Sequence, residues 1–178
     1  MILQQYKIVF AGAMGAGKSA AIKTISQIDV LSTEALNTDV AAHQKNLTTV
    51  GIDYGEIVLE DDIKVGLYGT PGQERFNFMW GVICKGALGT ILLIDHSIDD
   101  PISALEEYLA TFQEMSNNII IGITHVDEKT TQTTSIYRDW QQKQSHNYPL
   151  FFVDARVKED VLLMVDALIA NAEVNFAH

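Results

Sequence analysis

Residues Gly12–Ser19 have types and a spacing that could bind phosphate. They read Gly-Ala-Met-Gly-Ala-Gly-Lys-Ser and match the phosphate-loop pattern G-x-x-x-x-G-K-[ST]. The glycines let the backbone wrap around phosphate groups and point its N–H groups inward. Lys18 can reach the β- and γ-phosphates, and the Ser19 hydroxyl can ligate Mg²⁺. A helix that opens at Ala20–Ile22 turns its positive dipole end toward the anion. The motif therefore predicts binding of a nucleoside triphosphate.

A second segment with possible chemistry is Leu67–Phe76, which ends a predicted strand and continues into a Pro-Gly turn. In an α/β sheet the carboxyl ends of neighbouring parallel strands meet at the ligand. The backbone N–H of Gly72 can approach a γ-phosphate because no side chain blocks it. Gln73 is a neutral donor and acceptor that can hold a water molecule in line for attack. The alternative interpretation is a structural turn.

The sequence Gly-Thr-Pro-Gly-Gln-Glu-Arg-Phe at 69–76 resembles the switch II segment of Ras-like small GTPases, and Thr49-Val50-Gly51 resembles their switch I threonine. The form Gly-Thr-Pro-Gly-Gln is most similar to the MglA-like bacterial small GTPases. The resemblance implies GTP/GDP and Mg²⁺ as cofactors. It also implies metal ligation by Ser19 and Thr49, with Gln73 as the catalytic residue.

The segment Thr124-His125-Val126-Asp127 follows an apolar strand, where Ras-like proteins have Asn-Lys-x-Asp. The Asp127 carboxylate can accept hydrogen bonds from guanine N1–H and N2–H₂, a donor pair that adenine lacks. Thr124 and His125 replace the family's Asn and Lys. By the same resemblance the N–H of Ala155 meets guanine O6, and Arg156 is a looser match. The predicted nucleotide-binding residues are Gly12, Gly15, Ala16, Gly17, Lys18, Ser19, Ala20, Gly72, Thr124, His125, Asp127, Ala155 and Arg156.

One departure from the Ras-like pattern concerns the metal. That family usually has Asp at position 69, which holds Mg²⁺ through water, but this chain has Gly69. We hypothesise that Asp53 or Asp95 supplies the missing carboxylate, since both are expected near the ligand edge of the sheet. Met14 stands where Ras has a small glycine, so it either obstructs an incoming arginine or points aside.

Short apolar runs separated by helical patterns predict an α/β P-loop NTPase fold with a six-stranded, mostly parallel sheet and helices on both faces. Two of the runs flank Glu60–Asp62 and predict an antiparallel hairpin at one edge of the sheet. Residues 29–49 are polar without periodicity, which favours a functional or mobile segment. Strands are expected near 5–11, 51–59, 62–68, 87–95, 118–123 and 149–153, and helices near 18–28, 75–85, 101–115, 133–144 and 157–172.

The amino-acid composition limits the kinds of partner and the cellular compartment that we expect. The 178 residues fit one small-GTPase domain (1–178), and the net charge of −11 argues against nucleic acid. A single cysteine, Cys84, and the lack of a signal peptide or lipidation pattern predict a cytoplasmic protein without a direct membrane anchor. The resemblance implies GTPase-activating and effector partners, including roadblock-type proteins, and a monomer or weak dimer.

Three functions are compatible with these motifs. The first is a GTP-hydrolysing switch with mobile segments near 29–49 and 69–83, slow on its own because no arginine lies between residues 20 and 74. The second is a degenerate module that binds GTP with little hydrolysis. The third is a P-loop ATPase or kinase, in which the apolar run ending at Asp95 serves as a Walker B strand. The chain has only three arginines to clamp a transferred phosphoryl group, which weakens the kinase alternative.

Overall fold

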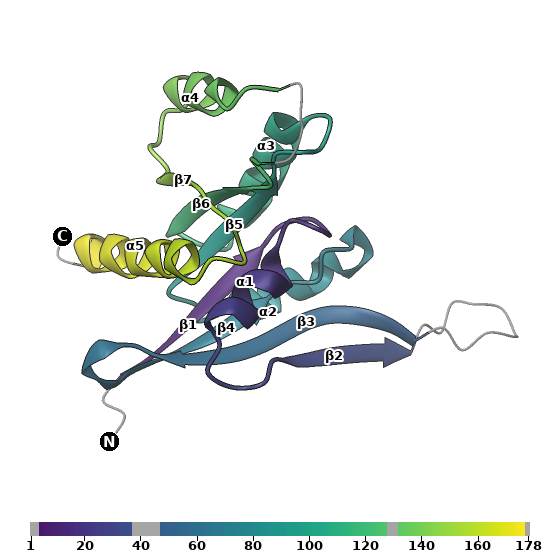
Figure 1. The fold of residues 1–178 in the computed structure, drawn as a ribbon, viewed down its shortest axis with the longest axis vertical. Coiled ribbons are helices and arrows are strands. Elements are labelled where there is room, and N and C mark those ends of the chain that lie inside the picture. The colour runs from purple at the N-terminus through teal and green to yellow at the C-terminus, as the bar shows by residue number, and fades with distance from the viewer. Residues whose placement is uncertain (1–3, 37–46, 128–131, 177–178) are drawn as a thin grey trace, which may run out of the picture.

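The computed structural model describes residues 4–36, 47–127 and 132–176 and shows an α/β fold (Figure 1). The strands are β1 (Gln4–Ala11), β2 (Leu31–Leu36), β3 (Leu47–Val58), β4 (Ile63–Gly69), β5 (Gly89–Asp95), β6 (Ile119–Thr124) and β7 (Leu150–Phe152). The α-helices are α1 (Lys18–Ile25), α2 (Trp80–Cys84), α3 (Pro101–Phe112), α4 (Ser135–Gln142) and α5 (Lys158–Phe176), and the 3₁₀ helices are η1 (Glu60–Asp62) and η2 (Glu74–Met79). No described helix combines the length and apolar character that a bilayer crossing requires.

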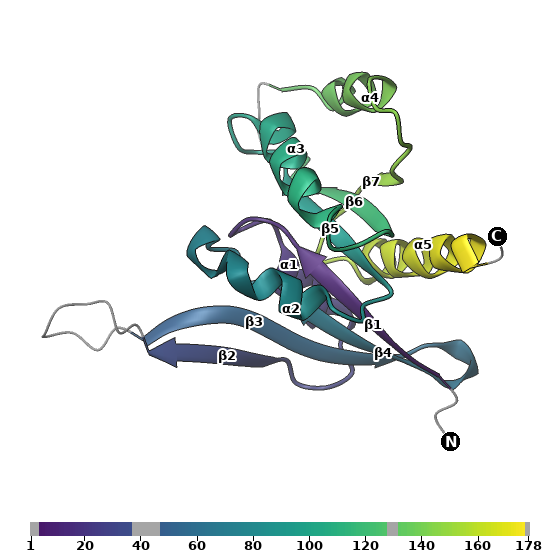
Figure 2. The ribbon, with the colours of Figure 1, turned by 180° about the vertical axis from the view of Figure 1, so that it is seen from behind.

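The strands form one mixed sheet in the order β2-β3-β4-β1-β5-β6-β7. In the part β4-β1-β5-β6-β7 each strand runs parallel to the next, and apolar clusters cover both faces of this part. Consecutive residues of β1 show the alternation: Ile8 and Phe10 join one apolar cluster, whereas Val9 and Ala11 join the other. Helices α1 and α5 cover one face, and α2 and α3 cover the opposite face (Figures 1 and 2).

The β3–β4 hairpin around Glu60–Asp62 confirms the predicted antiparallel pair. The expectation of six strands is wrong, because β2 pairs antiparallel with β3 and forms the true edge of the sheet. Its sequence, Leu-Ser-Thr-Glu-Ala-Leu, does not alternate apolar and polar residues, and Leu31 is 61% exposed. Backbone pairing with β3 makes this segment a strand, so its side-chain periodicity gives no signal.

The helix expected at 75–85 is divided into η2 and α2. Within α2, Trp80, Ile83 and Cys84 are buried, whereas Phe78 in η2 is 71% exposed. Burial of these three side chains stabilises α2 as an α-helix, whereas η2 exposes Phe78 and buries Met79 only in part. The aromatic residues that follow Gln73 are in this way divided between core and surface.

The parallel strands bring three loops to the same edge of the sheet as the phosphate loop. The N–H of Thr70 after β4 donates to the Phe10 carbonyl of β1 at 2.9 Å, and the N–H of His96 after β5 donates to the Thr124 carbonyl of β6 at the same distance. Strand β7 runs parallel to β6, so the β7–α5 loop leaves the sheet at the same edge as the segment after β6. This convergence builds the candidate site.

Candidate functional site

At two positions of the phosphate loop the backbone conformation and the close packing admit only glycine. Gly12 has φ +143°, and a Cβ there would lie 2.3 Å from the Leu93 carbonyl oxygen. Gly17 has φ +107° and caps α1, and a Cβ there would lie 3.1 Å from the Cβ of Ala155. The loop is therefore packed directly against β5 on one side and the β7–α5 loop on the other.

Lys18 is buried with its ammonium turned onto the phosphate loop. Its Nζ donates to the carbonyl oxygens of Gly12 and Ala13, each at 2.6 Å. Burial lowers the pKa of Lys18 to about 8, and the nearby Asp53 carboxylate partly opposes this shift. The charge on Lys18 is thus undercompensated, and a phosphate anion beside it would stabilise the ammonium form.

Ser19, the predicted metal ligand of the loop, is hydrogen-bonded to Asp53. Its Oγ donates to one carboxylate oxygen of Asp53, and Ser32 Oγ donates to the other at 2.6 Å. Asp53 is only 6% exposed. It lies directly opposite Gly69 in the β3–β4 ladder, and a Cβ at position 69 would be 3.7 Å from an Asp53 oxygen. The neighbouring strand therefore brings a carboxylate to the place from which the family's usual Asp is missing.

The same observations distinguish the two hypothesised carboxylates. Asp95 accepts hydrogen bonds from the N–H and the hydroxyl of Ser97, at 2.8 and 2.6 Å, and lies 4.0 Å from His125 Nε2. Asp53 instead contacts Ser19 itself. The geometry favours Asp53.

These groups fit a magnesium ion that also binds phosphate oxygens. A buried carboxylate and two hydroxyl groups supply the hard oxygen donors that Mg²⁺ prefers. They border a cavity of about 720 Å³, which is also lined by Lys23 and Asp29. Among the described residues, no three His, Cys, Asp or Glu side chains form a metal site by themselves.

Thr49, the other predicted metal ligand, lies in β3, where the structure describes its backbone but not its side chain. Its backbone pairs with Glu34 in the β2–β3 ladder. It precedes Asp53 by four residues, a separation of about 13 Å along an extended strand. Metal ligation by Thr49 stays a prediction.

Gly72 lies against the phosphate loop. A Cβ at this position would be 2.7 Å from the backbone nitrogen of Met14 and 2.9 Å from Lys18 Nζ. Gln73 follows and caps η2, with its carbonyl accepting from the Phe76 N–H at 3.0 Å. The Met14 side chain is 66% exposed, so the loop directs it to solvent.

The β6–α4 loop is joined to the phosphate loop by two side chains. Thr124 is 2% exposed, and its hydroxyl donates to the Ala16 carbonyl at 2.8 Å. His125 has φ +57°, and its Nε2 lies 3.0 Å from the Gly15 carbonyl oxygen. Although both residues depart from Asn-Lys, their polar atoms still connect the two loops.

A cavity of about 290 Å³ lies where the two loops meet the β7–α5 loop. Arg156 is held at its rim by Asp154, with Nε–Oδ1 2.9 Å and Nη2–Oδ2 2.7 Å, and its Nη2 lies 3.7 Å from Asp127. These hydrogen bonds from Arg156 lower the pKa of Asp154 to about 2. In the sequence, Asp154 and Arg156 match the family pattern only loosely, and their pairing becomes visible in the structure. The cavity is lined by Gly17, Ala20, Thr124, His125, Asp127, Asp154, Ala155 and Arg156.

The phosphate loop, the parallel sheet and the adjoining cavity define an α/β nucleotide-binding protein of the P-loop class. The chain belongs to the family described as "Conserved hypothetical ATP binding protein", whose match covers residues 27–171.

Similar curated proteins include the Ras-related protein Rab-26 of Rattus norvegicus, 27% identical over 116 residues (63% of this chain, 45% of the relative). Rab-26 of Mus musculus is 26% identical with the same coverage. The uncharacterized protein MJ1339 of Methanocaldococcus jannaschii is 31% identical over 93 residues (52% and 53%). The chain spans about half the length of these relatives. The matches support a relationship to Ras-like small GTPases.

Proposed function

We propose that this protein is a guanine-nucleotide-binding switch that hydrolyses GTP to GDP slowly, in the manner of MglA-like small GTPases. The observation that carries the proposal is the cavity of about 290 Å³ that joins the phosphate loop to Asp127. A single ligand can place its purine in this cavity and its phosphate chain on the phosphate loop. The similarity to Ras-related proteins supports the same assignment.

In the proposed complex the base lies in this cavity. Asp127 accepts from guanine N1–H and N2–H₂, and the N–H of Ala155 donates to O6. His125, held to Gly15, borders the base, as does Arg156, held to Asp154. The positions of both side chains are set by protein hydrogen bonds before the ligand arrives, which reduces the entropy lost on binding.

The phosphates lie on the loop at the start of α1. Lys18 neutralises the β- and γ-phosphates, and the N–H of Gly72 donates to the γ-phosphate. Gln73 orients the attacking water. Ser19 would hold Mg²⁺ directly and Asp53 through water, and the ion would neutralise charge that develops on the phosphates. The missing arginine leaves the reaction slow, on the order of 10⁻⁴ to 10⁻³ s⁻¹, as for Ras without an activator.

The proposed switch uses residues 29–49 and 69–83. Thr49 joins the metal only with the triphosphate bound, and loss of the γ-phosphate returns it to the β2–β3 ladder seen here. Partner proteins that read or accelerate this change, among them roadblock-type proteins, belong to the proposal. Gln73 is the residue such an activator would order.

The alternative with specific support is an ATP-binding protein, because the family description names ATP. The two are separated by displacing a fluorescent GDP analogue with GTP, ATP and XTP. We expect GTP to displace at least about 100-fold better than ATP, since Asp127 makes two charge-assisted hydrogen bonds to guanine alone. D127N reverses the preference toward XTP, whereas D139N, at an exposed aspartate of α4, changes nothing. Equal displacement by ATP and GTP would overturn guanine specificity.

Hydrolysis is measured separately. Single-turnover cleavage of bound GTP, with and without a copurifying partner, distinguishes the switch from a GTP-binding module. Cleavage that stays at the uncatalysed rate in both conditions would leave a binding module.

A further inference from the structure

A third cavity, of about 160 Å³, lies between the segment after β4 and helix α3. Figure 2 shows α2 and α3 on the face of the sheet opposite α1 and α5. None of the predicted nucleotide-binding residues lines it. We refer to it as the α2–α3 cup, and its lining residues are Glu74, Asn77, Trp80, Glu107, Tyr108 and Thr111.

Aromatic rings form one side of the cup. Trp80 and Tyr108 are 6% and 8% exposed, with ring centroids 5.6 Å apart. Phe112 stacks against Trp80 at 5.1 Å and supports the indole ring from the core. The rings are therefore fixed in place, and a flat ligand group can lie against them without ordering them first.

Two carboxylates add negative charge. Glu74 comes from η2 and Glu107 from α3, and both side chains are exposed. Burial raises the pKa of Tyr108, and the charges of Glu74 and Glu107 raise it further. Both carboxylates thus act on the same aromatic group, and none of the six lining residues carries a positive charge.

We propose that the α2–α3 cup binds an arginine side chain of a partner protein. A guanidinium is planar and stacks on indole and phenol rings, and its N–H groups can donate to the two carboxylates. The strongly acidic chain, with a net charge of −11, adds long-range attraction for a basic partner.

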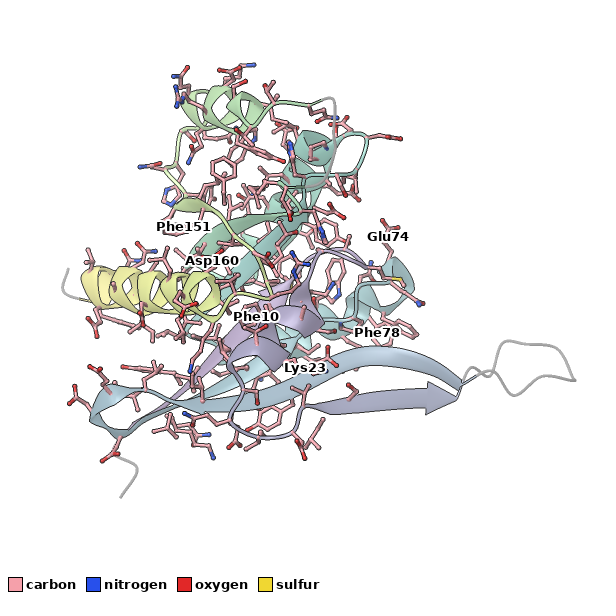
Figure 3. All side chains as sticks on the ribbon, viewed as in Figure 1. Phe10, Lys23, Glu74, Phe78, Phe151 and Asp160 are labelled. Carbon is pink, nitrogen blue, oxygen red and sulfur yellow. The ribbon has the colours of Figure 1, made fainter. Side chains whose placement is uncertain are left out.

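The segment that carries Glu74 and Trp80 favours a protein rather than a small metabolite as the source of the arginine. Phe78 and Val82, four residues apart on the same segment, are 71% and 73% exposed. Figure 3 shows Phe78 and Glu74 on this segment. Exposed apolar side chains on a segment that also lines a charged cavity are typical of an interface anchor and its surroundings.

The cup is connected to the loop that carries Gly72. The Trp80 indole N–H donates to the Pro71 carbonyl at 2.9 Å. An arginine on the indole would therefore be linked, through Trp80, to the segment that senses the γ-phosphate under the proposed function. Arginine binding itself needs no nucleotide, so it can be tested independently of that proposal.

The test is a titration of the nucleotide-free protein with Nα-acetyl-arginine methylamide, followed by the ¹H–¹⁵N signal of the Trp80 indole. W140F identifies which of the two indole signals is Trp80. We expect saturable binding in the millimolar range, weakened about threefold or more by E107Q and by E74Q. E106Q is the matched control, because Glu106 is exposed on α3 but does not line the cup.

Three results would overturn the proposal. The first is no saturable shift. The second is equal binding of the isosteric, uncharged citrulline derivative, which would make the cup an apolar site only. The third is binding that is seen only in R75Q, which would mean that this chain's own arginine fills the cup. Repeating the titration with GDP and then with a GTP analogue bound tests a separate point, namely whether arginine binding depends on the bound nucleotide.

Discussion

Gly69→Asp restores the residue usual in Ras-like proteins, and the structure predicts that it destabilises this one. A Cβ at position 69 lies 3.4 Å from the Cβ of Asp53 and 3.7 Å from its carboxylate oxygen. The substitution therefore places two carboxylates in one buried site. The backbone itself tolerates aspartate, because position 69 is extended β4.

The size of this destabilisation follows from the distance between the two carboxylates. Two like charges about 4 Å apart repel by about 4 kcal/mol at an effective dielectric constant of about 20. The introduced carboxyl group can escape this repulsion by staying protonated. From an ordinary pKa of about 3.9, protonation costs about 4 kcal/mol at pH 7 and about 1.5 kcal/mol at pH 5. The folded-state pKa is raised, so the stability of G69D falls as the pH rises from about 4 to about 7.

Gly69→Asn is the matched control, because its side chain has the same shape without the charge. Both variants push on the Ile22 Cδ1 atom, which lies 3.1 Å from the Cβ position. Thermal unfolding without nucleotide and with EDTA should show G69D below G69N by about 8–16 °C at pH 7, and by less at pH 5. The double variant D53N/G69D should regain the loss, because it moves one carboxylate across the ladder instead of adding a second.

The double variant also tests the metal proposal. The affinity for a fluorescent GDP analogue should depend on Mg²⁺ in the natural protein and in D53N/G69D, but much less in D53N. Equal stability of G69D and G69N at pH 7 would refute the position assigned to the Asp53 charge. A magnesium dependence unchanged in D53N would refute its role toward the ion.

Three further outcomes are expected. Binding of GTP at pH 8.5 should take up part of a proton, because Lys18 has a pKa of about 8 and phosphate favours its charged form. Calorimetry in buffers of different ionisation enthalpy measures this uptake, and zero uptake contradicts the prediction. Gln73→Leu should lower partner-stimulated turnover while GDP affinity stays within a few-fold; a large loss of affinity would assign Gln73 a structural role. Gly72→Ala should weaken a GTP analogue about tenfold in displacement assays and GDP much less. Only the γ-phosphate contact requires Gly72 to stay against the phosphate loop, where its Cβ would meet Met14 N at 2.7 Å. Equal losses would place Gly72 away from the γ-phosphate.

Local sequence determined the parts of the site that depend on backbone conformation and strand order. The glycines of 12–17 can be recognised because φ values of +143° and +107° exclude other residues. The apolar runs predicted the parallel strands, and parallel strands bring their carboxyl ends to one edge. For this reason the loops that contain Gly72 and Thr124 could be assigned to the same site from the amino-acid pattern alone.

Tertiary structure alone decided which distant residues meet. Asp53 and Asp95 are equivalent in the sequence, and only the β3–β4 register places Asp53 opposite Gly69 and beside Ser19. Trp80 and Phe78 are likewise both aromatic, but Trp80 is buried because it packs on α3, whereas Phe78 is exposed. Strand register and helix packing are set by the sum of many contacts across the fold, so no local pattern encodes them.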